Sequence, residues 1–149
     1  MIQRIQSIYL LISGLLTGSM FFVPLAELAN NEGSYTLLYR GLADSEQLTT
    51  PTLALAILVT ITTLISFVNI FLYKKRLIQI RLGGLNMGLL LGTTGMIYFL
   101  GSQVAKNLSA EISYKLPMVF PIVALILTFL AIRSIGKDEA LIKSMDRIR

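Results

Sequence analysis

Residues 52–101 read TLALAILVTITTLISFVNIFLYKKRLIQIRLGGLNMGLLLGTTGMIYFLG. This stretch contains two long apolar segments, about residues 52–73 and 82–101, joined by a basic linker at residues 74–81. A helix needs about 20 mostly apolar residues to cross a membrane, because each residue advances about 1.5 Å through about 30 Å of hydrocarbon. Both segments reach that length, and neither contains Asp, Glu, Lys or Arg. The stretch therefore predicts two antiparallel transmembrane helices.

Two more apolar segments, about residues 5–23 and 116–132, are equally free of charged side chains. Strands with open edges cannot span a membrane, because their unpaired backbone groups are too costly in lipid, so we expect four helices. A cleaved signal peptide is the alternative for the first segment, which its length and its poor A-x-A cleavage sites disfavour. The prediction is one all-α membrane domain over residues 1–149, a four-helix bundle with outer loops at about 24–51 and 102–115 and a cytoplasmic tail at about 133–149.

Composition and charge agree with this fold. Of 149 residues, 54% are hydrophobic and 14% are charged, against about 25% charged in a typical soluble domain. The two termini and the 74–81 linker are predicted to lie on one side of the membrane, and this side has ten basic and three acidic residues, a net charge of +7. The other side has a net charge of −2, and the two sum to the formal charge of +5. Because basic residues near membrane spans stay in the cytoplasm, both termini are expected there, with the chain in the cytoplasmic (inner) membrane. The high pI of about 9.7 indicates this topology and not a nucleic-acid partner.

Seven basic residues on the predicted cytoplasmic side are candidates for contact with anionic lipid or with a partner protein, each attracted to an anionic surface by about 1 kcal/mol. They are Lys74, Lys75, Arg76, Arg81, Lys143, Arg147 and Arg149.

The parts outside the membrane carry weaker patterns. Residues Ser34–Arg40 alternate, with Tyr35, Leu37 and Tyr39 on one face, which predicts a short strand in a small hairpin cap; residues 111–115 are its suggested partner strand. In the tail, the spacing of Leu141, Met145 and Ile148 predicts an amphipathic helix after a break at Gly136. We expect that helix to lie on the membrane surface, with docking of a cytoplasmic partner as the alternative.

Two helices carry small residues on one face. In the third segment Gly84, Gly88, Gly92 and Gly95 fall on one side, and in the first segment Ser7, Gly14 and Gly18 form a shorter seam. Between membrane helices, small residues let backbones approach closely. We therefore expect each of these faces to pack tightly on a neighbour, which could be the other face.

Polar residues suggest a further contact between the second and third segments. Thr62, Ser66 and Asn69 form a polar seam, and a turn centred between Leu77 and Ile78 brings Asn69 and Asn86 to the same depth. This predicts a hydrogen bond between the two asparagines, worth about 0.6–2 kcal/mol. Because Asn86 and Thr93 lie opposite the glycines, the third helix either sits between two neighbours or presents one face to another protein chain.

Several classes of chemistry are excluded. The chain has no His and no Cys, which removes imidazole bases, thiolate nucleophiles, haem ligation by His and common zinc sites. None of the four predicted spans has an ionisable Asp, Glu, Lys or Arg, which argues against ion-coupled transport. We expect no catalytic residue, no cofactor and no metal site.

Three stretches are distinctive: MIQRIQSIYLLISG at the start, LYKKRLIQIRLGGLNM in the middle and IRSIGKDEALIKSMDRIR at the end. With them, the whole chain resembles an uncharacterised family of small four-span bacterial membrane proteins, known as a domain of unknown function, from one large group of Gram-negative bacteria. The resemblance implies an inner-membrane location and a four-helix fold, and it supplies no activity or site residue.

Function is expected to be non-enzymatic. We expect an accessory or scaffold subunit of a larger membrane assembly, in contact with lipids and other membrane subunits. The alternative is a small uncoupled channel, or a carrier of lipid or another hydrophobic solute, that acts as a homo-oligomer. A hydrated or lipid-lined cavity between the second and third helices would favour that alternative.

Overall fold

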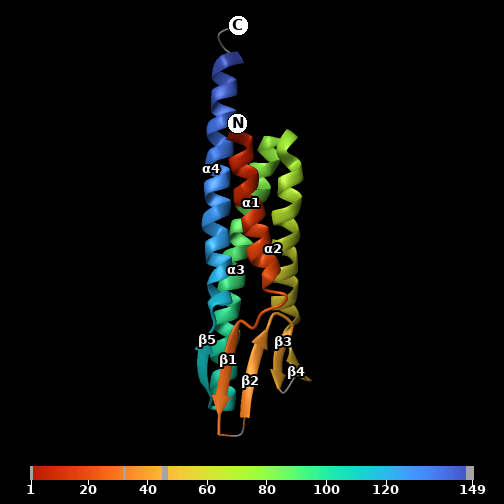
Figure 1. Cartoon of the computed structure of the whole chain (residues 1–149), viewed down its shortest axis with the longest axis vertical. Helices are drawn as coiled ribbons and strands as arrows, with labels where there is room; N and C mark the ends of the chain where they lie inside the picture. Colours follow the sequence, from red (N-terminus) through yellow and green to blue (C-terminus); the bar gives the residue numbers. More distant parts are fainter. Residues whose placement is uncertain (1, 32, 45–46, 147–149) are drawn as a thin grey trace.

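The computed structural model describes residues 2–31, 33–44 and 47–146, and over these residues it forms four long helices above one small sheet (Figure 1). The helices are α1 (Ile2–Ser19), α2 (Leu53–Phe71), α3 (Arg76–Leu108) and α4 (Phe120–Asp146), with one-turn 3-10 helices η1 (Leu72–Lys74) and η2 (Leu116–Val119) before α3 and α4. The strands are β1 (Ala26–Asn30), β2 (Gly33–Leu38), β3 (Gly41–Asp44), β4 (Gln47–Pro51) and β5 (Glu111–Tyr114).

Three helical segments of the described chain are long and apolar enough to cross a membrane, namely Leu53–Lys74, Arg76–Leu108 and Leu116–Met145. The first predicted span is also helical, but its apolar part, Ile5–Ser19, is shorter, and residues 20–23 form turns instead of continuing the helix. The four-helix bundle is therefore confirmed, and three of its four helices have the length and apolar character needed to cross a membrane.

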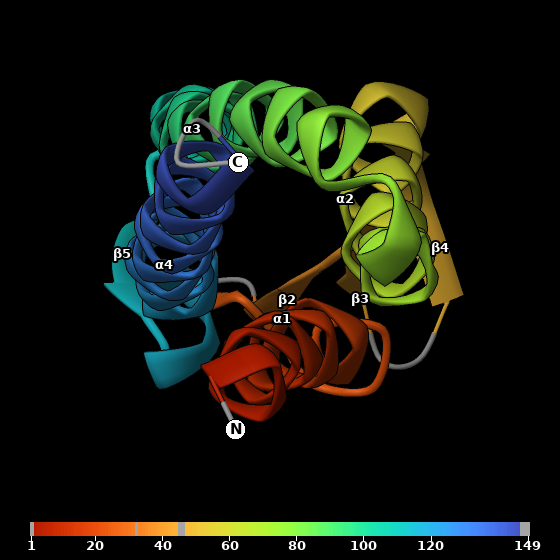
Figure 2. The ribbon, with the colours of Figure 1, turned by 90° about the horizontal axis from the view of Figure 1, so that it is seen from above.

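The four helices alternate in direction and form a ring in chain order, so that each helix packs against two others (Figure 2). The beginning of α1, the end of α4 and the connection between α2 and α3 lie at the end of the bundle opposite the sheet (Figure 1). Helix α3 thus packs against α2 and α4.

Helix α3 is longer than predicted at both ends. It takes in most of the predicted linker and continues through residues 102–108 of the predicted outer loop. No proline interrupts residues 76–108, and the helix ends only where Ser109 adopts a left-handed conformation (φ 47°). The Ala110 N–H then donates to the Ala105 carbonyl at 3.0 Å, which satisfies one of the last helical carbonyls.

The predicted break at Gly136 is wrong, because α4 runs through this position to Asp146. A glycine inside a helix costs about 1 kcal/mol relative to alanine, which local contacts can offset. Here Ile135 is buried, and Gln6 of α1 donates to Asp138 at 2.6 Å and to Ser134 at 3.5 Å. These contacts hold the helix on both sides of the glycine, so the tail is a continuation of α4 and not a separate helix.

The five strands form one antiparallel sheet in the order β4-β3-β2-β1-β5. The predicted strand at Ser34–Arg40 is confirmed as β2, which ends at Leu38, and the suggested strand at 111–115 is confirmed as β5. Its predicted pairing is wrong, because β5 pairs with β1 and β2 lies between β1 and β3. The small hairpin cap is thus a five-stranded sheet.

One face of the sheet packs on the extension of α3. Leu28, Leu37 and Leu42 are buried together, and Val104 and Leu108 of α3 pack against them. The part of α3 that the sequence analysis assigned to a loop is therefore the support of the sheet.

The same contact brings β5 against the helix. A Cβ added to Gly101 would lie 2.8 Å from Ile112 Cδ1, so a larger residue here would have to displace the end of that side chain. Tyr114 stacks on Tyr98 with ring centroids 6.0 Å apart. Burial raises the pKa of the Tyr114 phenol, and Tyr98 raises it further, so Tyr114 is neutral at physiological pH.

Candidate functional site

The interior of the bundle is polar but uncharged along much of its length. The buried polar side chains that the structure describes are hydroxyls and amides: Gln6, Ser13, Thr17, Thr62, Thr63, Ser66, Asn69, Gln79, Asn86, Thr93 and Thr128. Most of the hydroxyls donate to carbonyls of the preceding turn of their own helix, as Ser66 does to Thr62 at 2.9 Å. Such internal bonds satisfy hydroxyls in an apolar environment.

Two amide groups join α2 to α3. Asn86 Nδ2 donates to Ser66 Oγ at 2.9 Å, and Gln79 Nε2 donates to the main-chain oxygen of Asn69 at 3.0 Å. The predicted side-chain bond between Asn69 and Asn86 is therefore wrong, although a hydrogen bond between these two helices exists. The cause is the early start of α3 at Arg76, which moves the centre of the turn toward Lys75 and shifts the residue facing Asn86 by about one turn.

Two acceptor oxygens are left over at this contact. Asn69 Oδ1 and Asn86 Oδ1 are buried and have no hydrogen-bond partner among the described residues. The Ser66 hydroxyl donates to the Thr62 carbonyl and so does not donate to Asn86. A buried acceptor without a donor costs about 1–3 kcal/mol. These two oxygens therefore reduce the stability that the two hydrogen bonds between α2 and α3 contribute.

We expect a coupling energy of about 0.6–2 kcal/mol between Ser66→Ala and Asn86→Ala, because each substitution removes the same cross-helix bond. A double-mutant cycle of unfolding free energies, measured by denaturing detergent in mixed micelles, gives this value. The matched control pairs Asn86→Ala with Thr60→Ala, an exposed position on α2, and should be additive within about 0.5 kcal/mol. A coupling for Ser66 no larger than that for Thr60 would contradict the assignment.

Helices α1 and α4 are joined by hydroxyl groups that the sequence analysis missed. Ser13 Oγ lies 3.1 Å from Thr128 Oγ1 and donates to the Ala124 carbonyl at 3.2 Å. A lone Ser or Thr in an apolar segment is a weak signal, because it can satisfy its own hydroxyl within its helix. Only the pairing of two such residues across the bundle makes them a contact.

The glycines of the first helix are at a helix contact, as predicted. A Cβ added to Gly14 would lie 3.3 Å from the ring of Phe67 on α2, and one added to Gly18 would lie 3.8 Å from Thr63. The seam therefore packs on α2 and not on the glycines of α3.

The four glycines of α3 do not pack within the chain. Gly84, Gly88, Gly92 and Gly95, here called the glycine stripe, are all exposed, and a Cβ added to any of them would meet nothing within 4 Å in the described part of the chain. The neighbour predicted for this stripe is therefore not found within the described part of the chain, and the contact with the seam of the first helix, which the sequence left open, is not formed. The physical reason is that the opposite face of α3, with Asn86, already meets α2 and α4.

One glycine of α3 does lie at a tight contact, and the sequence analysis passed over it. A Cβ added to Gly83 would lie 2.9 Å from Ile132 of α4 and 3.3 Å from Asn69 Nδ2 of α2. Its signal in the sequence is its spacing of three residues from Asn86, which puts the two on the same face of α3.

The basic residues gather at the end of the bundle opposite the sheet. Lys74, Lys75 and Arg76 line a cavity of about 410 Å³ whose walls include Glu139, and Arg76 Nη1 is buried without a hydrogen-bond partner among the described residues. Lys143 pairs with Glu139 at 3.7 Å. Arg81 is exposed, while Arg147 and Arg149 lie outside the described residues. Contact of these residues with anionic lipid or a partner stays a prediction.

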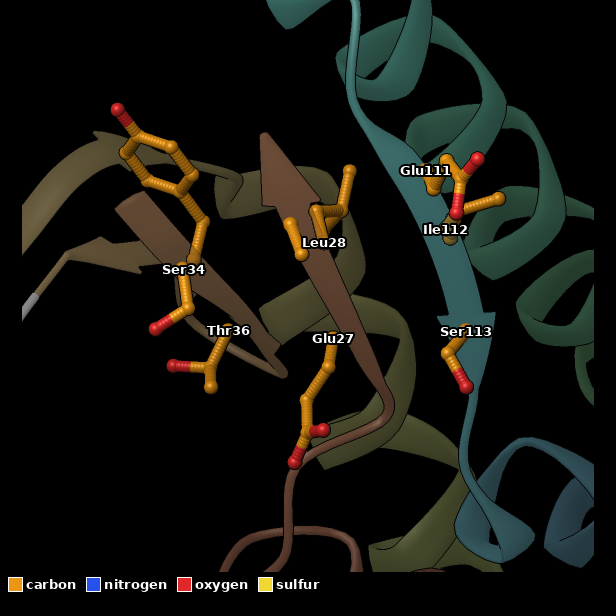
Figure 3. Close-up of a pocket in the computed structure, with 9 residues that line it drawn as sticks. Glu27, Leu28, Ser34, Thr36, Glu111, Ile112 and Ser113 are labelled. Carbon is orange, nitrogen blue, oxygen red and sulfur yellow. The ribbon is translucent and has the colours of Figure 1, made fainter. Parts of the chain in front are cut away.

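The outer face of the sheet forms an open polar hollow of about 440 Å³ (Figure 3). Glu27, Thr36 and Ser113 lie side by side on neighbouring strands and point into it, with Ser34 and Glu111 beyond them. Lys115 neutralises Glu27 at 2.7 Å. The described residues bring no three Asp or Glu side chains together in a possible metal site, here or elsewhere.

Of two comparisons with known proteins, one identifies a family of unknown function. A search of curated proteins finds no match. Residues 2–148 match a protein family described as "Domain of unknown function (DUF4293)". Because this match covers nearly the whole chain, the protein belongs to the DUF4293 family, whose function is uncharacterised.

Proposed function

We propose that this protein is a non-enzymatic accessory or scaffold subunit of a larger assembly in the cytoplasmic (inner) membrane of a bacterium. In this proposal the four helices span the membrane, both termini are cytoplasmic and the sheet lies on the outer side. The observation that carries it is the outward direction of the glycine stripe on α3.

The glycine stripe is costly unless something packs on it. Glycine in a helix costs about 1 kcal/mol relative to alanine, and the four stripe residues make no contact within the described chain that would offset this. From Gly84 to Gly95 the stripe is about 16 Å long, or about three helical turns. In a membrane, such a row lets the backbone of a second helix approach closely. A transmembrane helix of another subunit is therefore the occupant that we propose.

The distribution of charge supports the proposed orientation. Lys74, Lys75 and Arg76 lie at the end of the bundle opposite the sheet, together with Arg133 and Lys137 of α4. Basic residues near membrane spans are enriched on the cytoplasmic side.

The polar interior supports the alternative of a small channel or carrier. An apolar cluster that fills the bundle at the end next to the sheet opposes it. There buried apolar side chains of α2 and α3 pack together with Met20 and Leu25, which follow α1. Met118, before α4, and Phe120, at its start, pack against this cluster. The buried members are Met20, Leu25, Leu55, Val59, Ile97 and Leu100. The direct hydrogen bonds between α2 and α3 also speak against a path between these helices. Flux through liposomes that contain the purified protein would revive the alternative.

We expect Gly88→Leu together with Gly92→Leu to abolish co-purification of the partner subunit while the chain itself remains folded. The two leucines fill the stripe and keep a second backbone from approaching, yet they meet open space in the chain. The measurement is a pull-down of the tagged protein after mild solubilisation, with identification of co-purifying membrane proteins by mass spectrometry.

The control is Thr60→Leu, which also places a leucine at an exposed position, on α2 instead of α3, and should retain the partner. Retention of the same partner by the double glycine variant would contradict the role of the stripe. A wild-type protein that purifies only as a monomer, with no partner captured by crosslinking, would contradict the proposed function.

A further inference from the structure

A groove between α1 and α4 has the character of a small built site. It encloses about 270 Å³ near the end of the bundle opposite the sheet, and its lining combines two cations, two hydroxyls and two apolar side chains. These are Arg133 and Lys137, Tyr9 and Ser134, and Ile5 and Leu130.

The lining of the groove is basic. Arg133 and Lys137 are one helical turn apart on α4, where like charges repel, and neither forms an ion pair with a described residue. Of the two nearest carboxylates on α4, Glu139 pairs with Lys143 at 3.7 Å, and Asp138 accepts a hydrogen bond from Gln6 at 2.6 Å and keeps its charge, which offsets one of the two cations in part. Helix α1 has no acidic residue. An anion in the groove would relieve this repulsion.

The hydroxyl groups add donors for such an anion. Ser134 Oγ accepts a bond from Gln6 at 3.5 Å, which leaves its O–H free to donate, and Tyr9 contributes a phenol. Arginine binds phosphate oxygens through two parallel N–H groups, and lysine adds a point charge. The donor set therefore fits a phosphate group.

Apolar side chains extend the groove toward the middle of the bundle. Ile5 and Leu130 form its walls, and one turn beyond Leu130 the exposed Ile126 continues the row on α4. On α1 the exposed Ile12 lies two turns beyond Ile5. A phosphate group with a hydrocarbon chain attached would thus find contacts for both parts.

We propose that the groove between α1 and α4 binds one anionic phospholipid, with its phosphate between Arg133 and Lys137 and an acyl chain along Leu130 and Ile126. Basic pockets between membrane helices on the cytoplasmic side are known places for such headgroups. An anionic lipid fits better than a zwitterionic one, because a headgroup ammonium would be repelled by the two cations. The inference rests on the membrane orientation of the proposed function but not on the partner at the glycine stripe.

The test is native mass spectrometry of the purified full chain in detergent, with phosphatidylglycerol, phosphatidylcholine or inorganic phosphate added. Wild-type protein should retain one phosphatidylglycerol in preference to phosphatidylcholine, and inorganic phosphate in excess should not displace it. In Arg133→Gln with Lys137→Gln, the affinity for phosphatidylglycerol should fall about 25-fold, at about fivefold for each cation removed.

The matched control, Arg40→Gln with Lys106→Gln, removes the same charge at two exposed positions near the sheet, away from the groove, and should keep the bound lipid. An equal loss in this control, or displacement by inorganic phosphate, would overturn the proposal, as would wild-type protein with no preference for the anionic lipid. Failure of the lipid test leaves partner capture at Gly88 unaffected, so the two proposals can fail separately.

Discussion

Gly83→Leu is expected to reduce the folded yield of the protein sharply, while Gly84→Leu, one residue further along α3, leaves the yield unchanged. Even the Cβ atom at position 83 would lie 2.9 Å from two carbons of Ile132, which is closer than such atoms approach, and leucine adds three more carbons. Overpacking of this kind costs about 1–3 kcal/mol or more, and here it separates α3 from α4 beside Asn69. At position 84 an added side chain meets open space.

The measurement compares the two variants in the monodisperse fraction on size-exclusion chromatography and in resistance to denaturing detergent. The pair is well matched, because the two substitutions are identical in chemistry and adjacent in sequence. Equal behaviour of the two variants, whether both fold or both fail, would contradict the assignment of the inner and outer faces of α3.

Leu37→Ala is expected to destabilise the sheet by about 2–5 kcal/mol. Leu37 is fully buried between Leu28 and Leu42, in the cluster that joins the sheet to α3. Truncation leaves a cavity at the centre of this cluster, and a small sheet has few other apolar contacts to compensate. Hydrogen exchange should accelerate in residues 26–44 and 111–114, while the middle of the helical bundle keeps its protection.

The control is Thr36→Ala, one residue earlier in β2 on the open face of the sheet, which should change stability by no more than about 0.5 kcal/mol. Unchanged exchange in Leu37→Ala would mean that the sheet does not depend on its contact with α3.

The helices could be predicted from the sequence because the signal is strong and has a direct physical cause. Charge-free apolar segments of about 20 residues have one stable structure in lipid, since every backbone group must be satisfied within the segment. The ends were harder to place. Residues 76–81 and 102–108 are polar enough for a loop, but nothing in them breaks a helix, so α3 continues in both directions. At Gly136, the contacts of Gln6 with α4 outweigh the low helix propensity of glycine.

The sheet was only partly predictable. Strand β2 alternates clearly at Tyr35 and Leu37, whereas β1 (AELAN) and β3 (GLAD) are short and carry no β-branched or aromatic residue. Their pairing depends on the surface that Val104 and Leu108 offer, and this surface exists only because α3 extends past the predicted boundary.

The contacts of α3 were also only partly predictable from the sequence. Helical spacing correctly placed Asn86 and the glycine stripe on opposite faces of α3, because angular position follows from the sequence alone. Which face turns inward, and which residue of α2 lies opposite Asn86, depend on the length of the turn near Lys75 and on the neighbouring helices. Periodicity carries neither kind of information.

The most direct test of the proposed function is site-specific photocrosslinking in native membranes. A photoreactive residue replaces either Leu91, which is exposed on the same side of α3 as the glycine stripe, or Leu64, which is exposed on α2. We expect one discrete crosslinked product from position 91, containing a different membrane protein, and no such product from position 64. No product from position 91, the same product from both positions, or a product with twice the mass of this chain would contradict the proposed function.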